Sequence, residues 1–230
     1  MAQQGAISAL KVPPADGGCQ GTRSCAVSEK LALMIDGGFL KKKLYQQNHH
    51  PPTVQDITAF CTGIMQKQAL SQAQLLRIYF YDAPPFEGTV TNPLSGAPTN
   101  MAGTPQAVQN VQLLRSLELQ PNFAVRRGVV SCQGWKLGSA ALRAISQHPR
   151  PITANDLVPD LKQKGVDMRI GLDIAWLATK RLVDAIALVT GDSDFIAAMK
   201  LARKEGLRIY LETMNHPVYV ELRVHADVVL

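Results

Sequence analysis

The fold is decided by the stretch Ala187-Leu-Val-Thr-Gly-Asp-Ser-Asp-Phe195, in which an apolar run ends at a glycine and two carboxylates follow. This order is typical of a buried strand that delivers acids to the carboxyl edge of a parallel sheet. An earlier stretch, Leu31-Ala-Leu-Met-Ile-Asp-Gly-Gly-Phe39, has the same construction. Two strands that each end in Asp beside Gly predict one acidic pocket, and such a pocket suits a divalent metal ion.

The bulk composition fits a globular α/β protein. The chain has 230 residues, of which 46% are hydrophobic, and this length suffices for one domain with a sizeable core. No apolar run is long enough to cross a bilayer, and no secretory signal is visible at the N-terminus. The four cysteines form no C-x-x-C pair, so we expect reduced thiols and a cytoplasmic location.

The net charge is +6, although the expected pocket is built from acids. The positive charge must therefore lie elsewhere on the surface. A basic surface around an acidic metal site suits a polyanionic substrate such as RNA or DNA.

Strands alternate with helices along the chain. Residues 1–29 are rich in Gly, Ala, Ser, Gln and Pro and predict a flexible leader, and residues 30–230 are expected to form the folded domain. Within it we expect a long loop at about 83–105 and a hairpin or insertion at about 132–160. The remainder predicts a three-layer α/β/α sandwich with a mostly parallel central sheet, whose strands are expected at 30–36, 75–81, 123–130, 186–190 and 207–212.

Four carboxylates are the candidate metal ligands: Asp36, Asp173, Asp192 and Asp194. Magnesium and manganese prefer oxygen ligands, and such an ion can activate water for attack on a phosphodiester. Helix capping is the competing interpretation, because Asp36 precedes a helix and Ser193 and Asp194 open another. Asp173 lies among apolar residues of a predicted helix, where an exposed face is the alternative.

Two other enzyme classes are less consistent with the Gly-Asp-Ser-Asp segment. Phosphatases of the haloacid-dehalogenase type need an Asp-x-Asp nucleophile loop, whereas Asp36 is followed by two glycines. Esterases with a Gly-Asp-Ser element carry an Asp-x-x-His near the end, whereas here His225 precedes Asp227.

Five short motifs occur together in order: Met34-Ile-Asp-Gly-Gly-Phe39, Tyr79-Phe-Tyr-Asp82, Lys164-Gly-Val-Asp167, Leu172-Asp173 and Thr190-Gly-Asp-Ser-Asp-Phe195. With them the chain, from about residue 30 to 227, resembles the LabA-like branch of the NYN domain family, within the PIN-like nuclease superfamily. The resemblance implies an α/β/α sandwich and a metal-dependent endoribonuclease that uses Mg²⁺ or Mn²⁺. It places Asp36, Asp173, Asp192 and Asp194 at the catalytic metal centre, with Asp167 either as a ligand or as a support behind one.

RNA contacts are expected from basic residues near the pocket and from one hydroxyl: Lys41, Lys42, Lys43, Arg126, Arg127, Lys164, Arg169 and Ser193. The alternative function is a non-catalytic RNA-binding or regulatory protein-interaction domain on the same fold. No membrane partner is expected, and homodimerisation is left open.

Overall fold

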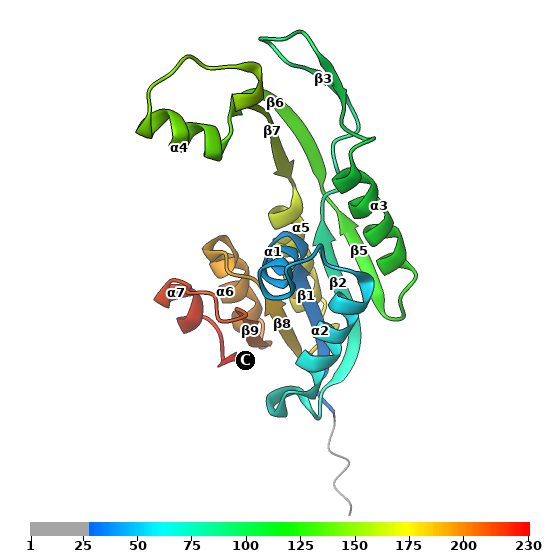
Figure 1. The fold of residues 1–230 in the computed structure, drawn as a ribbon. Coiled ribbons are helices and arrows are strands. Elements are labelled where there is room, and N and C mark those ends of the chain that lie inside the picture. Colours follow the sequence, from blue (N-terminus) through cyan, green and yellow to red (C-terminus); the bar gives the residue numbers. More distant parts are fainter. Residues whose placement is uncertain (1–27) are drawn as a thin grey trace, which may run out of the picture.

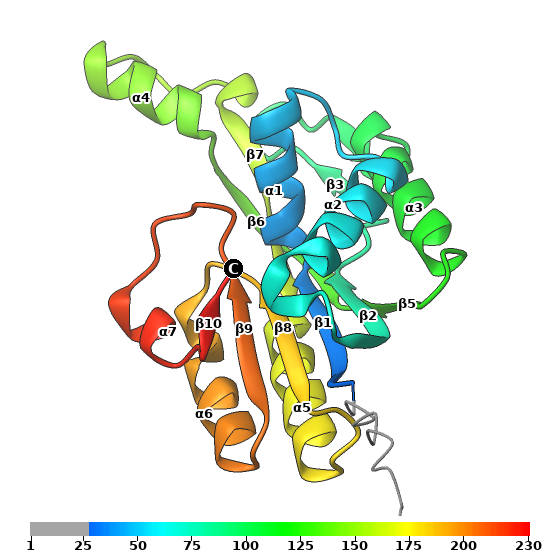
Figure 2. The same ribbon diagram turned by 90° about the horizontal axis from the view of Figure 1, so that it is seen from below.

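The computed structural model describes residues 28–230, so most of the predicted leader, with Cys19 and Cys25, lies outside the described residues. Its centre is a six-stranded sheet in the order β10-β9-β8-β1-β2-β5, in which every neighbouring pair is parallel (Figures 1 and 2). The strands are β1 (Lys30–Asp36), β2 (Gln74–Asp82), β5 (Phe123–Arg127), β8 (Ala185–Val189), β9 (Arg208–Glu212) and β10 (Val228–Val229). The predicted parallel sheet is therefore confirmed.

Helices cover both faces of the sheet and form a three-layer sandwich. One face packs against α1 (Gly37–Asn48), α2 (Val54–Gln66) and α3 (Pro105–Glu118). The other packs against α5 (Val166–Thr179) and α6 (Ile196–Lys204). Strand β1 shows why both faces must be covered: its alternate residues enter opposite cores, and all from Leu31 to Ile35 are fully buried.

Local signals fix several helix ends. Thr53 caps α2 in a capping box with Asp56, and Thr104 precedes α3 with Pro105 in its first turn. The predicted helix over 194–205 begins as a 3₁₀ turn, Ser193–Phe195, before α6. Gly206 ends α6 with a φ of +93°, the left-handed conformation that favours glycine. The chain closes with α7 (Val220–Val224) and β10, a strand that the sequence did not predict.

The predicted strand over 123–130 divides at Gly128. Its first part is β5 in the sheet, and its second part opens β6 (Val129–Leu137), which pairs antiparallel with β7 (Leu157–Lys164). A Cβ on Gly128 would lie 2.6 Å from Val166 Cγ2, so only glycine fits where the chain leaves the sheet.

The pair β6–β7 forms an arm, and α4 (Ser139–Gln147) lies at its far end (Figures 1 and 2). No residue of α4 is buried. The region predicted as a hairpin or insertion is thus an antiparallel arm that extends from the sandwich. The expected loop at 83–105 holds a second short hairpin, β3 (Thr89–Thr91) with β4 (Pro98–Asn100). No helix within residues 28–230 combines the length and apolar character that crossing a bilayer requires.

Candidate acidic active site

The two strands that carry the predicted acids are neighbours. Ile35 of β1 lies in register with Val189 of β8, so Asp36 and the Thr190-Gly191-Asp192 segment emerge at the same carboxyl edge (Figure 2). Helix α5 begins at that edge as well, because β7 returns the chain there and Asp167 lies in its first turn. This is the edge of a parallel sheet at which ligands bind.

Asp36 ends β1 and caps α1. Its Oδ1 accepts a hydrogen bond from the backbone N–H of Phe39 at 3.1 Å. The pKa of Asp36 is raised from 3.8 to about 6, chiefly by burial and also by the charges of Asp167 and Asp192, against the lowering effect of the capping bond. The predicted capping role is therefore real, but capping alone would lower this pKa.

The Gly-Asp-Ser-Asp segment turns sharply after β8. Asp192 caps the 3₁₀ turn: its Oδ1 accepts from the N–H of Asp194 at 2.9 Å, and its own N–H donates to Thr190 Oγ1 at 3.1 Å. The cap is thus Asp192 rather than Asp194, which stays exposed in the turn. Ser193 lies between them and is half-buried.

Asp167 joins this group electrostatically. Burial, together with the charges of Asp192 and Asp194, raises the pKa of Asp167 above its ordinary value. We call Asp36, Asp167, Asp192 and Asp194 the acidic cluster. Within residues 28–230, none of the four forms an ion pair with a lysine, arginine or histidine.

Two further strand-end acids flank the acidic cluster, and sequence reasoning did not select either as a site residue. Asp82, at the end of β2, is fully buried and pairs with Lys41, whose ammonium also donates to Asn110 Oδ1 at 3.0 Å. Glu212, at the end of β9, is 5% exposed and pairs with Lys67 at 2.5 Å. Both carboxylates are neutralised, which separates them from the acidic cluster.

Asp173 lies on α5, further from its start than Asp167. Its Oδ2 accepts from Tyr81 Oη at 2.9 Å and from Arg126 Nε at 3.1 Å. Its charge is not among those that raise the pKa of Asp36 or Asp167. Asp36, Asp192 and Asp194 thus lie with Asp167 at the carboxyl edge of the sheet, whereas Asp173 bonds to Tyr81 of β2 and Arg126 of β5.

Four of the seven predicted RNA-contacting cations already have partners. Lys41 pairs with Asp82, Arg126 with Asp173, and Arg127 with Glu118 at 2.7 Å, while Lys43 Nζ lies 3.1 Å from His216 Nδ1. Three are exposed and form no ion pair with any residue of 28–230: Lys42, Lys164 and Arg169. Lys41, Arg126 and Arg127, which form ion pairs, hold the fold, although they lie close to the acids in sequence or in space.

The acidic cluster offers a divalent metal only part of a ligand shell. Among residues 28–230, no three His, Cys, Asp or Glu side chains converge closely enough to form a complete metal site. Magnesium commonly takes only one or two protein carboxylates and completes its shell with waters and substrate phosphates. Unpaired carboxylates that raise one another's pKa suit that mode, because a dication would relieve their repulsion.

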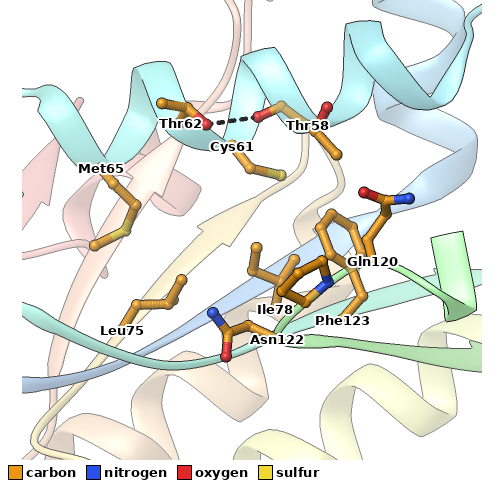
Figure 3. Close-up of a pocket in the computed structure, with 10 residues that line it drawn as sticks. Thr58, Cys61, Thr62, Met65, Leu75, Ile78, Gln120, Asn122 and Phe123 are labelled. Atoms are coloured by element: carbon orange, nitrogen blue, oxygen red, sulfur yellow. Dashed lines mark hydrogen bonds between the residues drawn. The ribbon is translucent and has the colours of Figure 1, made fainter.

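A separate pocket of about 350 Å³ opens between α2 and the first residues of β2 and β5 (Figure 3). Its lining is mostly apolar, and Thr62 in its wall donates a hydrogen bond to the backbone oxygen of Thr58 at 2.9 Å. Burial raises the pKa of the Cys61 thiol to about 12, so this group is a poor nucleophile. Because parallel strands begin at the opposite edge from the acids, this pocket is separate from the acidic cluster.

A family model described as the NYN domain matches residues 100–227, more than half of the chain. The chain belongs to the NYN domain family, which generally has a PIN-like nuclease fold and whose members are typically ribonucleases. The match includes Asp167, Asp173, Asp192 and Asp194, and it begins after Asp36. None of the curated proteins compared with the chain matches it.

Two solved structures are similar to the chain. A protein of unknown function from Vibrio parahaemolyticus is 16% identical with a TM-score of 0.49, over 88% of this chain and 92% of that one. The nicotinamidase of Staphylococcus aureus is 11% identical with a TM-score of 0.31, over 87% of this chain and 99% of that one. At such values neither structure bears on what this chain does.

Proposed function

We propose that this NYN domain is a metal-dependent endoribonuclease of the LabA-like branch, which hydrolyses RNA phosphodiester bonds at the acidic cluster. The observation that carries the proposal is the absence of a cationic partner for these four carboxylates within residues 28–230, although the chain as a whole carries a net charge of +6. Proteins rarely gather carboxylates without compensation unless a bound cation or a reaction uses them.

Asp36, Asp192 and Asp194 would hold Mg²⁺ or Mn²⁺, with Asp167 beside them. The ion, when bound, would polarise a phosphodiester and lower the pKa of a coordinated water. Asp167, whose charge raises the pKa of Asp36, would support this set, and Asp173, which pairs with Arg126, stays a candidate fourth ligand beside it. With a pKa near 6, Asp36 holds its proton in mild acid, so the cation must compete with that proton below about pH 6.

The residues of the chain orient the reacting groups. The hydrogen bond from the Phe39 N–H fixes the carboxylate of Asp36, and the hydrogen bond from the Asp194 N–H fixes that of Asp192. The first N–H groups of α1 point toward the same edge, where a helix N-terminus favours a phosphate. Exposed Lys42, Lys164 and Arg169 supply positive charge that attracts the RNA backbone.

The test is cleavage of labelled single-stranded and duplex RNA, with matched DNA, in the presence of Mn²⁺. Wild type is expected to cut RNA and to stop when EDTA is added. Asp36→Asn and Asp192→Asn should each lower the rate by about 100-fold or more, as expected when a charge that stabilises the transition state is removed. Glu205→Gln, at the end of α6 and on the opposite edge of the sheet, is the matched control and should keep the wild-type rate.

Two outcomes would contradict this function. Cleavage that survives both Asp36→Asn and Asp192→Asn would remove the acidic cluster from the reaction. RNA binding without any cleavage at high protein excess would instead favour the non-catalytic RNA-binding domain. Mn²⁺ binding, followed by calorimetry on wild type and Asp192→Asn, separates a metal site from a catalytic one.

A further inference from the structure

Three side chains form a second cluster next to the Gly-Asp-Ser-Asp segment, which we call the aromatic–lysine cluster: Phe39, Lys43 and His216. The rings of Phe39 and His216 lie 5.8 Å apart between centroids, with an angle of 55° between their planes. Lys43 Nζ lies 5.9 Å from the centre of the Phe39 ring and 3.1 Å from His216 Nδ1. All three side chains are half-buried, so each is partly open to solvent.

The backbone places this cluster against the acidic cluster. Phe39 and Lys43 are one helical turn apart and lie on the same face of α1. The N–H of Phe39 is the group that Asp36 caps. His216 comes from the loop after β9, which runs beside the segment that follows β8.

Gly191 brings the two clusters into contact. A Cβ at this position would lie 2.6 Å from His216 Cδ2 and 2.8 Å from Phe39 Cε2. The two rings therefore close directly over the backbone that leads into Asp192. A side chain larger than hydrogen at position 191 would push them away.

The three groups offer the chemistry that recognises a nucleotide. A lysine ammonium only donates, so His216 Nδ1 must accept and Nε2 then carries the ring proton. The ammonium keeps two further N–H donors for a phosphate. Two adjacent rings supply the face on which an unpaired base stacks, and stacking needs no particular base.

We propose that the aromatic–lysine cluster binds one nucleotide of single-stranded RNA beside the cleavage site, with its base on the rings of Phe39 and His216 and its phosphate on Lys43. The proposal rests on RNA as the substrate of the acidic cluster. It assigns the binding of an unpaired base to residues of α1 and of the β9–α7 loop. Duplex RNA would not fit, because its bases are stacked and paired with one another.

The first experiment measures RNA binding without cleavage. The Asp192→Asn protein is the parent, and it is titrated into a fluorescent single-stranded RNA. Three double variants, which add Phe39→Leu, His216→Ala or His216→Phe to the parent, are measured in the same way. The first two additions should weaken binding by about tenfold, because each removes part of a stacking face. His216→Phe keeps a ring and should bind within about twofold of the parent.

An abasic scan then tests stacking directly. Single abasic sites are placed at successive positions of the RNA. At one position, the loss of the base is expected to lower the affinity of the parent protein by about tenfold. In the Phe39→Leu background the same abasic site should cost almost nothing, because the ring that stacked on that base is gone. Equal losses in both backgrounds at every position would overturn the proposal.

Salt dependence tests the phosphate contact. Lys43→Ala should reduce the slope of log affinity against log salt by about 0.7, the value for one phosphate contact on a single strand. Lys180→Ala, an exposed lysine just past the end of α5 on the opposite edge, is the control and should leave the slope unchanged. An unchanged slope with Lys43→Ala would remove the lysine from the site.

The outcomes separate this proposal from the proposed function. Cleavage by wild type with unchanged RNA affinity in Phe39→Leu, His216→Ala and Lys43→Ala would leave the ribonuclease standing and overturn the nucleotide site. If these substitutions lower only the melting temperature, the cluster is a latch between α1 and the β9–α7 loop. The expected losses of affinity without any cleavage by wild type would uphold the site and refute the nuclease.

Discussion

Four neighbouring strands end in acids or lead directly into them at one edge of the sheet, and the inner pair differs from the outer pair. On the outer strands, Asp82 of β2 and Glu212 of β9 are buried and paired with Lys41 and Lys67. On the inner strands, Asp36 ends β1 and Asp192 follows β8, and neither has a cationic partner within the described part of the chain. Carboxylates at one edge of the sheet therefore have two different electrostatic states.

This difference separates acids that stabilise the fold from acids that cost stability. In a buried carboxylate–lysine pair each charge has a partner. Removing one partner leaves the other charge unpaired in the low-dielectric interior of the protein. The unpaired acids of the inner strands raise one another's pKa instead. Folding keeps them together at a cost, which is expected where an active site needs uncompensated charge.

Breaking an outer pair should give the largest effect on stability. Lys41→Met keeps the stem of the side chain but leaves Asp82 buried without its cation, and we expect a loss of about 4 kcal/mol in the free energy of unfolding. Urea denaturation at pH 7 measures it.

The double variant Lys41→Met with Asp82→Leu is the control for that measurement. It removes both charges, so it should recover most of the lost stability. If Lys41→Met alone were as stable as wild type, Asp82 would not depend on its lysine and the distinction between the two pairs of strands would fail.

Adding a metal should act on the inner acids only. At a Mn²⁺ concentration 100 times its dissociation constant, a site present only in the folded protein stabilises it by about 2.7 kcal/mol. Wild type and Lys67→Met should both gain this stability, whereas a variant with Asp36→Asn and Asp192→Asn should gain almost none. Thermal unfolding with and without Mn²⁺ gives the comparison, and an equal gain in all three proteins would place the ion elsewhere.

The sequence was sufficient for the parts of the fold that the core dictates. Apolar runs that end at Gly or Asp predicted β1 and β8, and their shared construction predicted that Asp36 and Asp192 lie at one edge. The arm gave no such pattern, because few of its residues face the core and α4 buries none.

The pairing of acids with lysines could not be predicted either. Asp82 looks like Asp36 in sequence, and its cation lies 41 positions earlier in the chain. His216 belongs to a loop and forms no motif with Phe39. Such contacts depend on how α1 and the loops pack in three dimensions, and the order of residue types along the chain does not determine that packing.

Removing the charge of Asp36 should stabilise the protein at neutral pH in EDTA. Its pKa is about 6 in the folded state against 3.8 ordinarily, so the unfolded chain releases this proton more readily and folding stability falls between those values as pH rises. Asp36→Asn keeps the capping bond and removes the charge, so it should add about 3 kcal/mol at pH 7.5 and nothing below pH 3.8.

Chemical denaturation of Asp36→Asn at pH 7.5, 5 and 3.5 follows this change. Asp56→Asn is the contrasting variant, because hydrogen bonds from the backbone and side chain of Thr53 lower the pKa of Asp56. That substitution should destabilise the protein at neutral pH. A stability difference for Asp36→Asn that does not change with pH would mean that Asp36 is not under electrostatic stress.

The smallest effect on stability is expected at Asp173, and its substitution tests whether the acidic cluster extends along α5. Asn at this position still accepts from Tyr81 but loses the ion pair with Arg126, a half-exposed contact, so the loss of stability should be about 1 kcal/mol. The cleavage rate should stay within about tenfold of wild type, because Asp173 is paired with Arg126, unlike the four acids of the acidic cluster. Loss of cleavage with unchanged stability would instead make Asp173 a metal ligand, as its motif predicts. The acidic site would then extend along α5 toward β2 and β5, and Arg126 would be the cation that the metal displaces.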